Sequence, residues 1–264
     1  MKSRVIICGY PKSGNTWLTR LTAEIINCPV VGFWCEPFNK EEAIEGSDRE
    51  SNYECFKGHH SIEQLKHTLN VYGNGTEKII YIYRDPRAVV LSAYHYFSWV
   101  KPEYPNVLNI MSMLPRGSKY YYKYLHKSSY RFEVITQGFI CGTKELAWLD
   151  TPWAEHVKGF INLPNILCIS YEMLKKDPLL VAKDISDFLS CNKTDYELQH
   201  AIDEQSFEKK KKRFREGGQG AKASFLRRGE SEAWKRELPE KYIRYVEQNL
   251  GAFMTELGYP LSHL

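Results

Sequence analysis

The stretch Gly9-Tyr10-Pro11-Lys12-Ser13-Gly14-Asn15-Thr16-Trp17 directly follows the apolar run Val5-Ile6-Ile7-Cys8. The apolar run predicts a buried strand, and the glycines that flank the loop predict a tight turn into a helix. A strand, a glycine-flanked loop and a helix N-terminus together direct several backbone N–H groups at one anion. The sequence therefore predicts a phosphate-binding loop at residues 9–17.

This loop differs at one place from the nucleotide-binding pattern G-x-x-x-x-G-K-[ST]. Its glycines have the right spacing and Thr16 supplies the hydroxyl, but Asn15 stands where the pattern has lysine. The lysine lies inside the loop instead, at Lys12. A charge there would lie beside the terminal end of a bound phosphate chain, which favours group transfer from a nucleotide other than ATP. The enzymatic alternative is a P-loop kinase, which needs Mg²⁺ and the missing lysine.

Composition predicts an ordinary globular protein. With 264 residues, 43% of them hydrophobic, the chain suits one domain over residues 1–264. The net charge of +4 fits a small polyanionic ligand and requires neither nucleic acid nor a membrane. We expect a cytoplasmic protein, because the first apolar run is too short for a signal peptide and no segment could span a bilayer. The seven scattered cysteines indicate reduced thiols and no metal site.

Strand and helix patterns alternate along the chain. Short apolar runs predict strands that are covered on both faces, at Val5–Gly9, Cys55–Lys57, Lys78–Tyr83 and Ile166–Ser170. Helical patterns cover Trp17–Ile26, Arg87–Phe97, Pro178–Leu189 after an Asp177 N-cap, and Pro239–Leu257. This alternation predicts a doubly wound α/β fold, with a central, mostly parallel sheet flanked by helices. Ligands bind at the carboxyl ends of the strands in such folds.

Two segments have no clear place in this alternation. Residues 98–130 are rich in Tyr, Pro and Met without a clean period, and we expect a lid or an acceptor pocket there. The basic run Lys209–Arg215 could neutralise several nucleic-acid phosphates. We interpret it instead as the solvated end of a helix that enters a mobile segment closing over the nucleotide.

A second group of basic residues extends the predicted anion site. Arg84 ends the strand Lys78–Tyr83, and Ser92 lies about two turns into the next helix. The guanidinium and the hydroxyl can approach one phosphate from two sides. Further along, Arg227-Arg228-Gly229 adds two guanidinium groups and a flexible glycine. Three separated basic elements predict a ligand with phosphates at both ends.

With these motifs in place, the sequence resembles the cytosolic-type sulfotransferase family, whose donor is 3′-phosphoadenosine 5′-phosphosulfate (PAPS). The family's loop Pro-Lys-Ser-Gly-Thr-Thr-Trp is matched by residues 11–17, and its Arg and Ser spaced eight apart are matched by Arg84 and Ser92. Its late Arg-Lys-Gly is matched by residues 227–229. Residues 171–173 and 206–207 resemble its Tyr-Glu and Ser-Phe segments. The resemblance covers nearly the whole chain.

The resemblance implies roles for individual residues. Lys12 stabilises the bridging oxygen as the S–O bond breaks, and Ser13 holds Lys12 aside until the acceptor is present. Lys57-Gly58-His59 matches the family's Lys-x-His, which makes His59 the general base, with His60 as the alternative. No metal is required. The implied donor-binding residues are Lys12, Ser13, Gly14, Asn15, Thr16, Trp17, Arg84, Ser92, Tyr171, Phe207, Arg227, Arg228 and Gly229, with Trp17, Tyr171 and Phe207 at the adenine.

Departures from the family pattern leave some properties open. Asn15 replaces a threonine, which phosphate binding tolerates if that position contributes its backbone N–H. Arg228 replaces a lysine and keeps the charge. No match to the family's dimerisation motif follows Trp234-Lys235, so the oligomeric state is left open.

The sequence predicts a small-molecule acceptor with a hydroxyl or an amine. The resemblance to bacterial enzymes that tailor small molecules suggests a natural product such as a saxitoxin-type alkaloid. A non-catalytic nucleotide-binding or polyanion-binding module is the alternative from another class. Lys12 and His59 together argue against it, because binding alone requires no base.

Overall fold

The computed structural model describes residues 2–35, 44–97, 127–146, 148–206, 209 and 230–262. They belong to two compact units, each described here by itself. The first comprises Met1–Asp85 with Ala154–Ser231, and the second comprises Pro86–Trp153 with Glu232–Leu264. The single domain expected over residues 1–264 stays a prediction.

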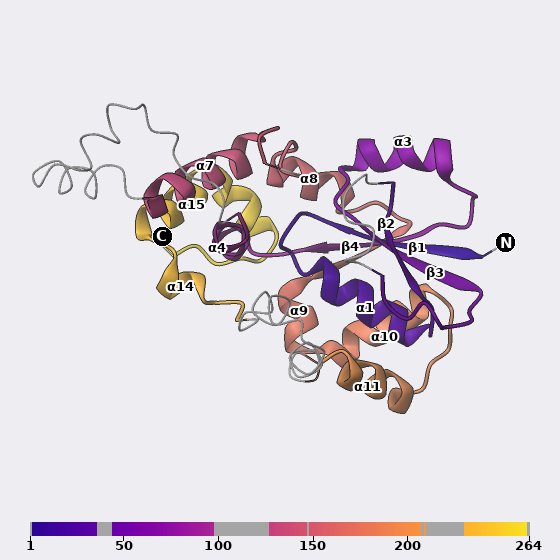
Figure 1. The fold of residues 1–264 in the computed structure, drawn as a ribbon. Helices are drawn as coiled ribbons and strands as arrows, with labels where there is room; N and C mark the ends of the chain where they lie inside the picture. The colour runs from indigo at the N-terminus through magenta and orange to yellow at the C-terminus, as the bar shows by residue number, and fades with distance from the viewer. Residues whose placement is uncertain are drawn as a thin grey trace, which may run out of the picture. The chain divides into compact units, whose positions relative to one another are not determined.

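A parallel sheet forms the centre of the first unit (Figure 1). Within the described residues its strands are β1 (Ser3–Gly9), β2 (Val30–Phe33), β3 (Tyr53–Gly58), β4 (Lys78–Tyr83) and β5 (Ile166–Ser170). They are ordered β2-β3-β1-β4-β5, and every neighbouring pair is parallel. The chain reverses its direction of winding at β1, and such a switch point is where α/β sheets bind ligands. The predicted α/β class is confirmed.

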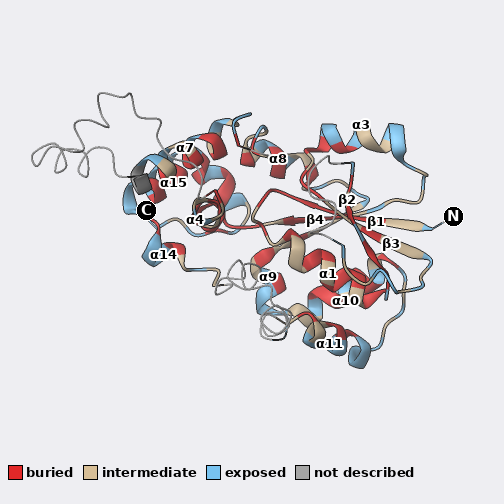
Figure 2. Ribbon diagram, viewed as in Figure 1, coloured by how far each residue is buried: buried red, intermediate tan, exposed pale blue. Residues whose placement is uncertain are grey.

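Helices of the first unit lie on both faces of this sheet. In Figure 1, α1 (Asn15–Ile25) and α10 (Pro178–Phe188) lie on one face and α3 (Ile62–Tyr72) lies on the other. The other helices in the described part of this unit are α8 (Trp153–Phe160), which begins at the last residue of the second unit, α9 (Tyr171–Lys176) and α11 (Asp195–Glu204). Because both faces are covered, β1 is buried along five successive residues, as the red strand in Figure 2 shows.

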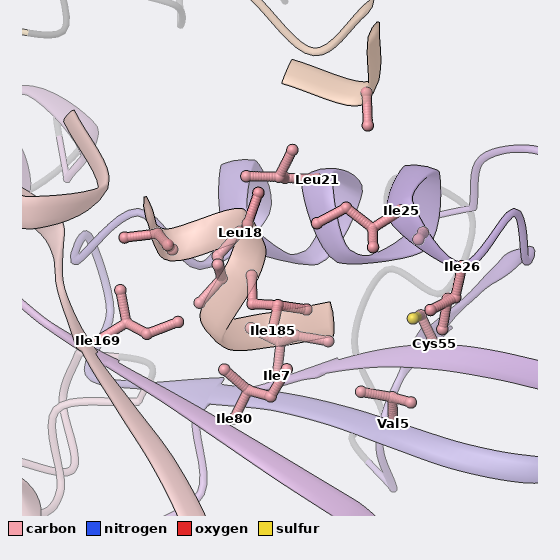
Figure 3. Packing of buried hydrophobic residues seen from close by; sticks show 14 of the residues in the cluster. Val5, Ile7, Leu18, Leu21, Ile25, Ile26, Cys55, Ile80, Ile169 and Ile185 are labelled. Atoms are coloured by element: carbon pink, nitrogen blue, oxygen red, sulfur yellow. The ribbon is translucent and has the colours of Figure 1, made fainter. Parts of the chain in front are cut away.

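The core between the sheet and α1 follows from the two-residue period of the strands. Ile7 and Ile80 point from neighbouring strands toward Leu18 of α1 and Ile185 of α10 (Figure 3). Each of these four side chains is fully buried. Burying a branched aliphatic side chain of this size contributes about 1.5–3 kcal/mol, so this layer holds α1 and α10 against the sheet.

The opposite face of the sheet carries aromatic residues. Tyr81 alternates with Ile80 along β4 and stacks on Phe160 of α8, with ring centroids 4.1 Å apart. A side chain on Gly159 would collide with Ile62 of α3, so the glycine permits α8 and α3 to approach closely. This packing brings α8 against the strands that carry the site.

The second unit is helical in its described residues. It contains α4 (Pro86–Tyr96), α7 (Lys127–Cys141), α14 (Trp234–Glu237) and α15 (Glu240–Glu256). Tyr94 of α4 stacks on Phe132 of α7 with ring centroids 3.8 Å apart. Tyr242 of α15 lies 5.2 Å from the ring of Phe132. Aromatic packing therefore joins three of the helices.

Most of the predicted elements are present with small shifts at their ends. The elements that were not predicted are β2, α3, α7, α8, α9, α11 and α14. α7 begins at Lys127, so residues 127–130 of the segment expected to form a lid or an acceptor pocket are helical, and residues 98–126 lie outside the described residues. In the predicted basic run, Lys209 forms an ion pair with Glu204 at 2.8 Å. The other residues of that run lie outside the described residues. None of the described helices is long and apolar enough to cross a membrane.

Candidate active site

The loop between β1 and α1 has the geometry of an anion site. Lys12 and Gly14 have positive φ angles of 69° and 103°, and they turn the chain sharply into α1. A side chain on Gly14 would lie 2.6 Å from the ring of Tyr171, so only glycine fits there. The first N–H groups of α1 have no partners within the helix and carry its positive dipole end. The loop can therefore hold a phosphate, as its sequence predicts.

Among the described residues, several buried polar atoms in this region have no hydrogen-bond partner, and one of them is the Oδ1 of Asn15. Two more bear directly on anion binding. One is the Oγ of Ser13, a fully buried residue in the loop, and the other is the Nε of Arg84 at the end of β4. A buried polar atom without a partner destabilises the protein by about 1–3 kcal/mol. Such atoms occur where a ligand completes the hydrogen bonding, which fits a phosphate-bearing donor at this loop.

Arg84 joins the loop to an aromatic pair. One guanidinium nitrogen donates to the backbone oxygen of Lys12 at 3.3 Å, and the guanidinium carbon lies 4.1 Å from the ring centroid of Tyr171. Trp17 meets Tyr171 edge-on, with centroids 6.0 Å apart. The stacking fixes the plane of the guanidinium and leaves its Nε in the loop region. Three predicted donor-binding residues are thus brought together by β4, α1 and α9.

His59 lies beside the loop because β3 pairs with β1. Cys8 is opposite Gly58 in this pairing, so the residues that follow the two strands are neighbours. The Nδ1 of His59 is 2.9 Å from the backbone oxygen of Gly9 and 3.0 Å from the Nδ2 of Asn15. The imidazole is buried, with 8% of the residue exposed. The predicted base therefore contacts the phosphate loop directly.

The positive charges at the site repel one another. Burial and the neighbouring charges of Lys57 and Arg84 lower the pKa of Lys12 from 10.5 to about 7. Burial also lowers the pKa of His59 well below 6.5, and Lys57 adds to this effect, while the hydrogen bond to Gly9 opposes it. His59 is consequently neutral at physiological pH, and Lys12 is poised to change charge.

A second buried histidine supports this arrangement. The Nε2 of His156 in α8 donates to the backbone oxygen of His59 at 3.2 Å, which leaves its Nδ1 to accept from the hydroxyl of Tyr81 at 2.9 Å. His156 and Tyr81 were not singled out from the sequence. Their residue types were visible, but a histidine in a helix gives no local sign that it will meet a residue 97 positions away.

The structure describes some of the other predicted site residues but not all of them. Asn15 and Thr16 open α1, and His60 is half-buried next to His59. Ser92 lies in α4 and belongs to the second unit. Phe207, Arg227, Arg228 and Gly229 lie outside the described residues. Their roles stay predictions.

Comparison with known proteins identifies the class. Residues 2–258 match the family model described as "Sulfotransferase domain". Flavonol 3-sulfotransferase of Flaveria bidentis is 25% identical over 284 residues, which cover 94% of this chain and 82% of that protein. Amine sulfotransferase of Oryctolagus cuniculus is also 25% identical, with 98% and 84% covered.

Solved structures share the fold. Mouse sulfotransferase SULT7A1, complexed with PAP, superposes with a TM-score of 0.67 at 22% identity, and the match covers 98% of this chain and 86% of that one. The chain belongs to the sulfotransferase domain family. The resemblance to PAPS-dependent sulfotransferases that its motifs indicate is confirmed, and the chain is an enzyme of that class.

Proposed function

We propose that this enzyme transfers a sulfuryl group from PAPS to a hydroxyl or amine of a small molecule, with His59 as general base and Lys12 stabilising the leaving phosphate. The observation that carries the proposal is the contact of His59 with the phosphate loop through the Gly9 carbonyl, at 2.9 Å. It brings a base and a cation to the carboxyl ends of two neighbouring parallel strands. In-line transfer needs this arrangement, because acceptor and leaving group lie on opposite sides of the moving sulfur.

The reaction breaks the bond between sulfur and the bridging phosphate oxygen and forms a bond between sulfur and the acceptor atom. The acceptor proton passes to the Nε2 of His59, while Lys12 stabilises the negative charge on the released phosphate. Ser13 orients the Lys12 ammonium, as the motif implies. A dianionic phosphate next to Lys12 favours the charged amine and so counteracts the lowered pKa.

The donor is held by groups at both of its ends. The motif matches assign Arg84 and Ser92 to the 3′-phosphate, and the backbone of residues 13–16 binds the 5′-phosphosulfate. Trp17 and Tyr171 contact the adenine. Phe207, Arg227, Arg228 and Gly229 complete the donor site through their motif matches. Support comes from the Nε of Arg84, which has no hydrogen-bond partner in the described part of the chain, and from the PAP bound in mouse sulfotransferase SULT7A1. The chain's own basic residues supply the charge that this chemistry needs.

The acceptor side is lined by Phe33 and Lys57. The Lys57 ammonium lies 4.7 Å from the ring centroid of Phe33, and that ring lies 6.1 Å from His59. An aromatic wall beside the base suits a small acceptor with a ring or an apolar part. Relatives named for flavonol and amine acceptors are consistent with this class. A saxitoxin-type alkaloid stays a prediction.

Two measurements test the function. PAP should raise the melting temperature of the protein more than ATP with Mg²⁺ does, because a ligand specific for the native state stabilises it. With labelled PAPS and a panel of phenols, alcohols and amines, H59A should lower kcat by about 10²- to 10⁴-fold, the usual contribution of a general base. Lys66 is exposed on α3 and is none of the site residues, so K66A should retain activity. Preferential stabilisation by ATP with Mg²⁺, or full turnover by H59A, would contradict the proposal.

A further inference from the structure

A chain of buried hydrogen bonds lies next to the proposed base. The Nε2 of His156 in α8 is 3.2 Å from the backbone oxygen of His59, and its Nδ1 is 2.9 Å from the hydroxyl of Tyr81 in β4. The backbone of Tyr10 in the phosphate loop also forms a hydrogen bond with that hydroxyl. His156 is 2% exposed, and Tyr81 is fully buried. Groups from the phosphate loop, β4 and α8 therefore meet beside the residue that carries the base.

The directions of these bonds follow from the groups that make them. The carbonyl oxygen of His59 can only accept, so the Nε2 of His156 donates. Burial raises the pKa of Tyr81 well above 10, so its hydroxyl keeps the hydrogen that it donates to the Nδ1 of His156. The hydroxyl oxygen then accepts from the N–H of Tyr10. Each of the three bonds has one donor and one acceptor when His156 is neutral and carries its hydrogen at Nε2.

Ring packing fixes the direction in which His156 donates. Its imidazole stacks against Tyr81, with centroids 5.8 Å apart and planes at 27°, and lies 5.6 Å from the ring of Phe160 one turn further along α8. Tyr10 meets the same imidazole edge-on, with centroids 5.3 Å apart. A ring that is enclosed in this way has little freedom to turn, so its N–H is held toward the carbonyl of His59.

The backbone of His59 lies where the sheet no longer supports it, because β3 ends one residue earlier. The next carbonyl, that of His60, accepts from the thiol of Cys8 at 3.2 Å, and a thiol is a weak donor. The ring of His59 is held separately, with its Nδ1 2.9 Å from the backbone oxygen of Gly9. The buried bond from His156 therefore restrains the backbone at the point where the pairing of strands stops.

We propose that His156 is a positioning residue, which Tyr81 orients and which fixes the backbone of His59 so that the base keeps its place at the phosphate loop. The inference rests on the proposed role of His59. His156 acts through His59 and does not contact the reacting atoms. The effect is one of geometry, because a shift of about 1 Å in a catalytic group can lower the rate about 10²-fold.

Activity measurements separate positioning from a purely structural role. H156L removes both polar atoms and should lower kcat about 10- to 100-fold, while PAP affinity stays within about threefold of the wild type. H156Q keeps an N–H donor and a carbonyl acceptor and should restore kcat to within about fivefold of the wild type. Y81F keeps the ring on Phe160 but removes the hydroxyl, and should lower kcat about 3- to 10-fold. Equal losses in H156L and H156Q, or an unchanged kcat in Y81F, would overturn the inference.

A double-mutant cycle tests whether His156 acts through His59. The H59A background has no base to position, so H156L should lower its kcat by less than about twofold. Losses that multiply in H59A/H156L would give His156 a role independent of the base and would refute the inference. Y242F is the matched control, because it also removes the hydroxyl of a buried tyrosine, one that donates to Glu133 at 3.4 Å. Its kcat should equal that of the wild type.

Spectra of the free protein test the same link without turnover. In protein labelled with ¹⁵N at histidine, H59Q and H156Q identify the signals of two of the eight histidines. At pH 7.5 His156 should show a protonated Nε2, and the ring signals of His59 should shift or broaden in H156L and Y81F but not in Y242F. Unchanged His59 signals in Y81F would overturn the inference, even if H156L does not fold. Full turnover by H59A would instead contradict the proposed base, so the two failures are distinguishable.

Discussion

The fold places Lys12 where a positive charge on its side chain is unfavourable. It has a left-handed backbone conformation with φ of 69°, and burial of its ammonium, together with the charges of Lys57 and Arg84, lowers its pKa. The pKa of about 7 means that the unfolded chain, whose lysine titrates near 10.5, binds more protons between these two values. The residue is therefore unfavourable for folding at neutral pH and is placed for its interaction with a phosphate.

Replacing Lys12 by methionine should stabilise the protein while abolishing sulfuryl transfer. The unfavourable contribution is fully present below pH 7, declines as the pH rises from about 7 to 10.5, and is gone above 10.5. We expect K12M to gain about 1–2 kcal/mol in the free energy of unfolding at pH 6.5, and less at pH 9.5. Urea unfolding at both values measures this difference. K66M, at an exposed position of α3, should change nothing, and an equal gain at both pH values would refute the explanation.

At the scale of elements, helix starts are set by local residues and helix positions by buried contacts. Ser61 caps α3 by accepting from the N–H of Gln64, whose side chain accepts from the N–H of Ser61 in return. This Ser-x-x-Gln pattern was readable in the sequence and could have predicted α3. In the second unit, α4 and α15 are joined by Arg87, which donates to Glu247 at 2.6 Å and lies 3.8 Å from the ring centroid of Trp234.

Breaking the Arg87 pair should destabilise the second unit strongly. R87M leaves the buried Glu247 carboxylate without its cation, which costs about 3–5 kcal/mol, whereas R87M/E247L should recover much of the loss. Burial raises the pKa of Glu247, but hydrogen bonds from Ser262 and Arg87 outweigh this and lower it below 4.5. The pair's contribution is thus present above that pH and is lost as the pH falls through the folded-state value. Thermal unfolding at pH 7 and pH 3 tests both expectations; a double variant no better than R87M would contradict them.

At the scale of the whole molecule, ligand binding and protonation are linked. The free protein holds Lys12 mostly neutral at pH 8, because its pKa is about 7, and a bound phosphate favours the charged form. We expect PAP binding at pH 8 to take up about one proton. Calorimetric titrations in Tris and HEPES measure the uptake as the dependence of the apparent enthalpy on the buffer's ionisation enthalpy. K12M should lose this dependence, and a wild type without it would disprove the linkage.

The sequence by itself determined the phosphate loop and the α/β class. A buried strand, the glycines and Lys12 all lie within residues 5–17, and local conformational preferences are enough to define such a unit. Dependence on local patterns also explains why β2 was missed. This strand has four residues and is interrupted by Gly32, so it is too short to show an alternation of apolar and polar residues.

Only the tertiary structure decided what surrounds the base. The contacts of His59 with Asn15 and His156 join residues 44 and 97 positions apart. They exist because β3 pairs with β1 and because α8 packs against the aromatic face of the sheet, and no local pattern specifies either neighbour. The orientation of the imidazole, its hydrogen bonds and the lowered pKa values of Lys12 and His59 arise from that packing, because burial and distant charges act through space.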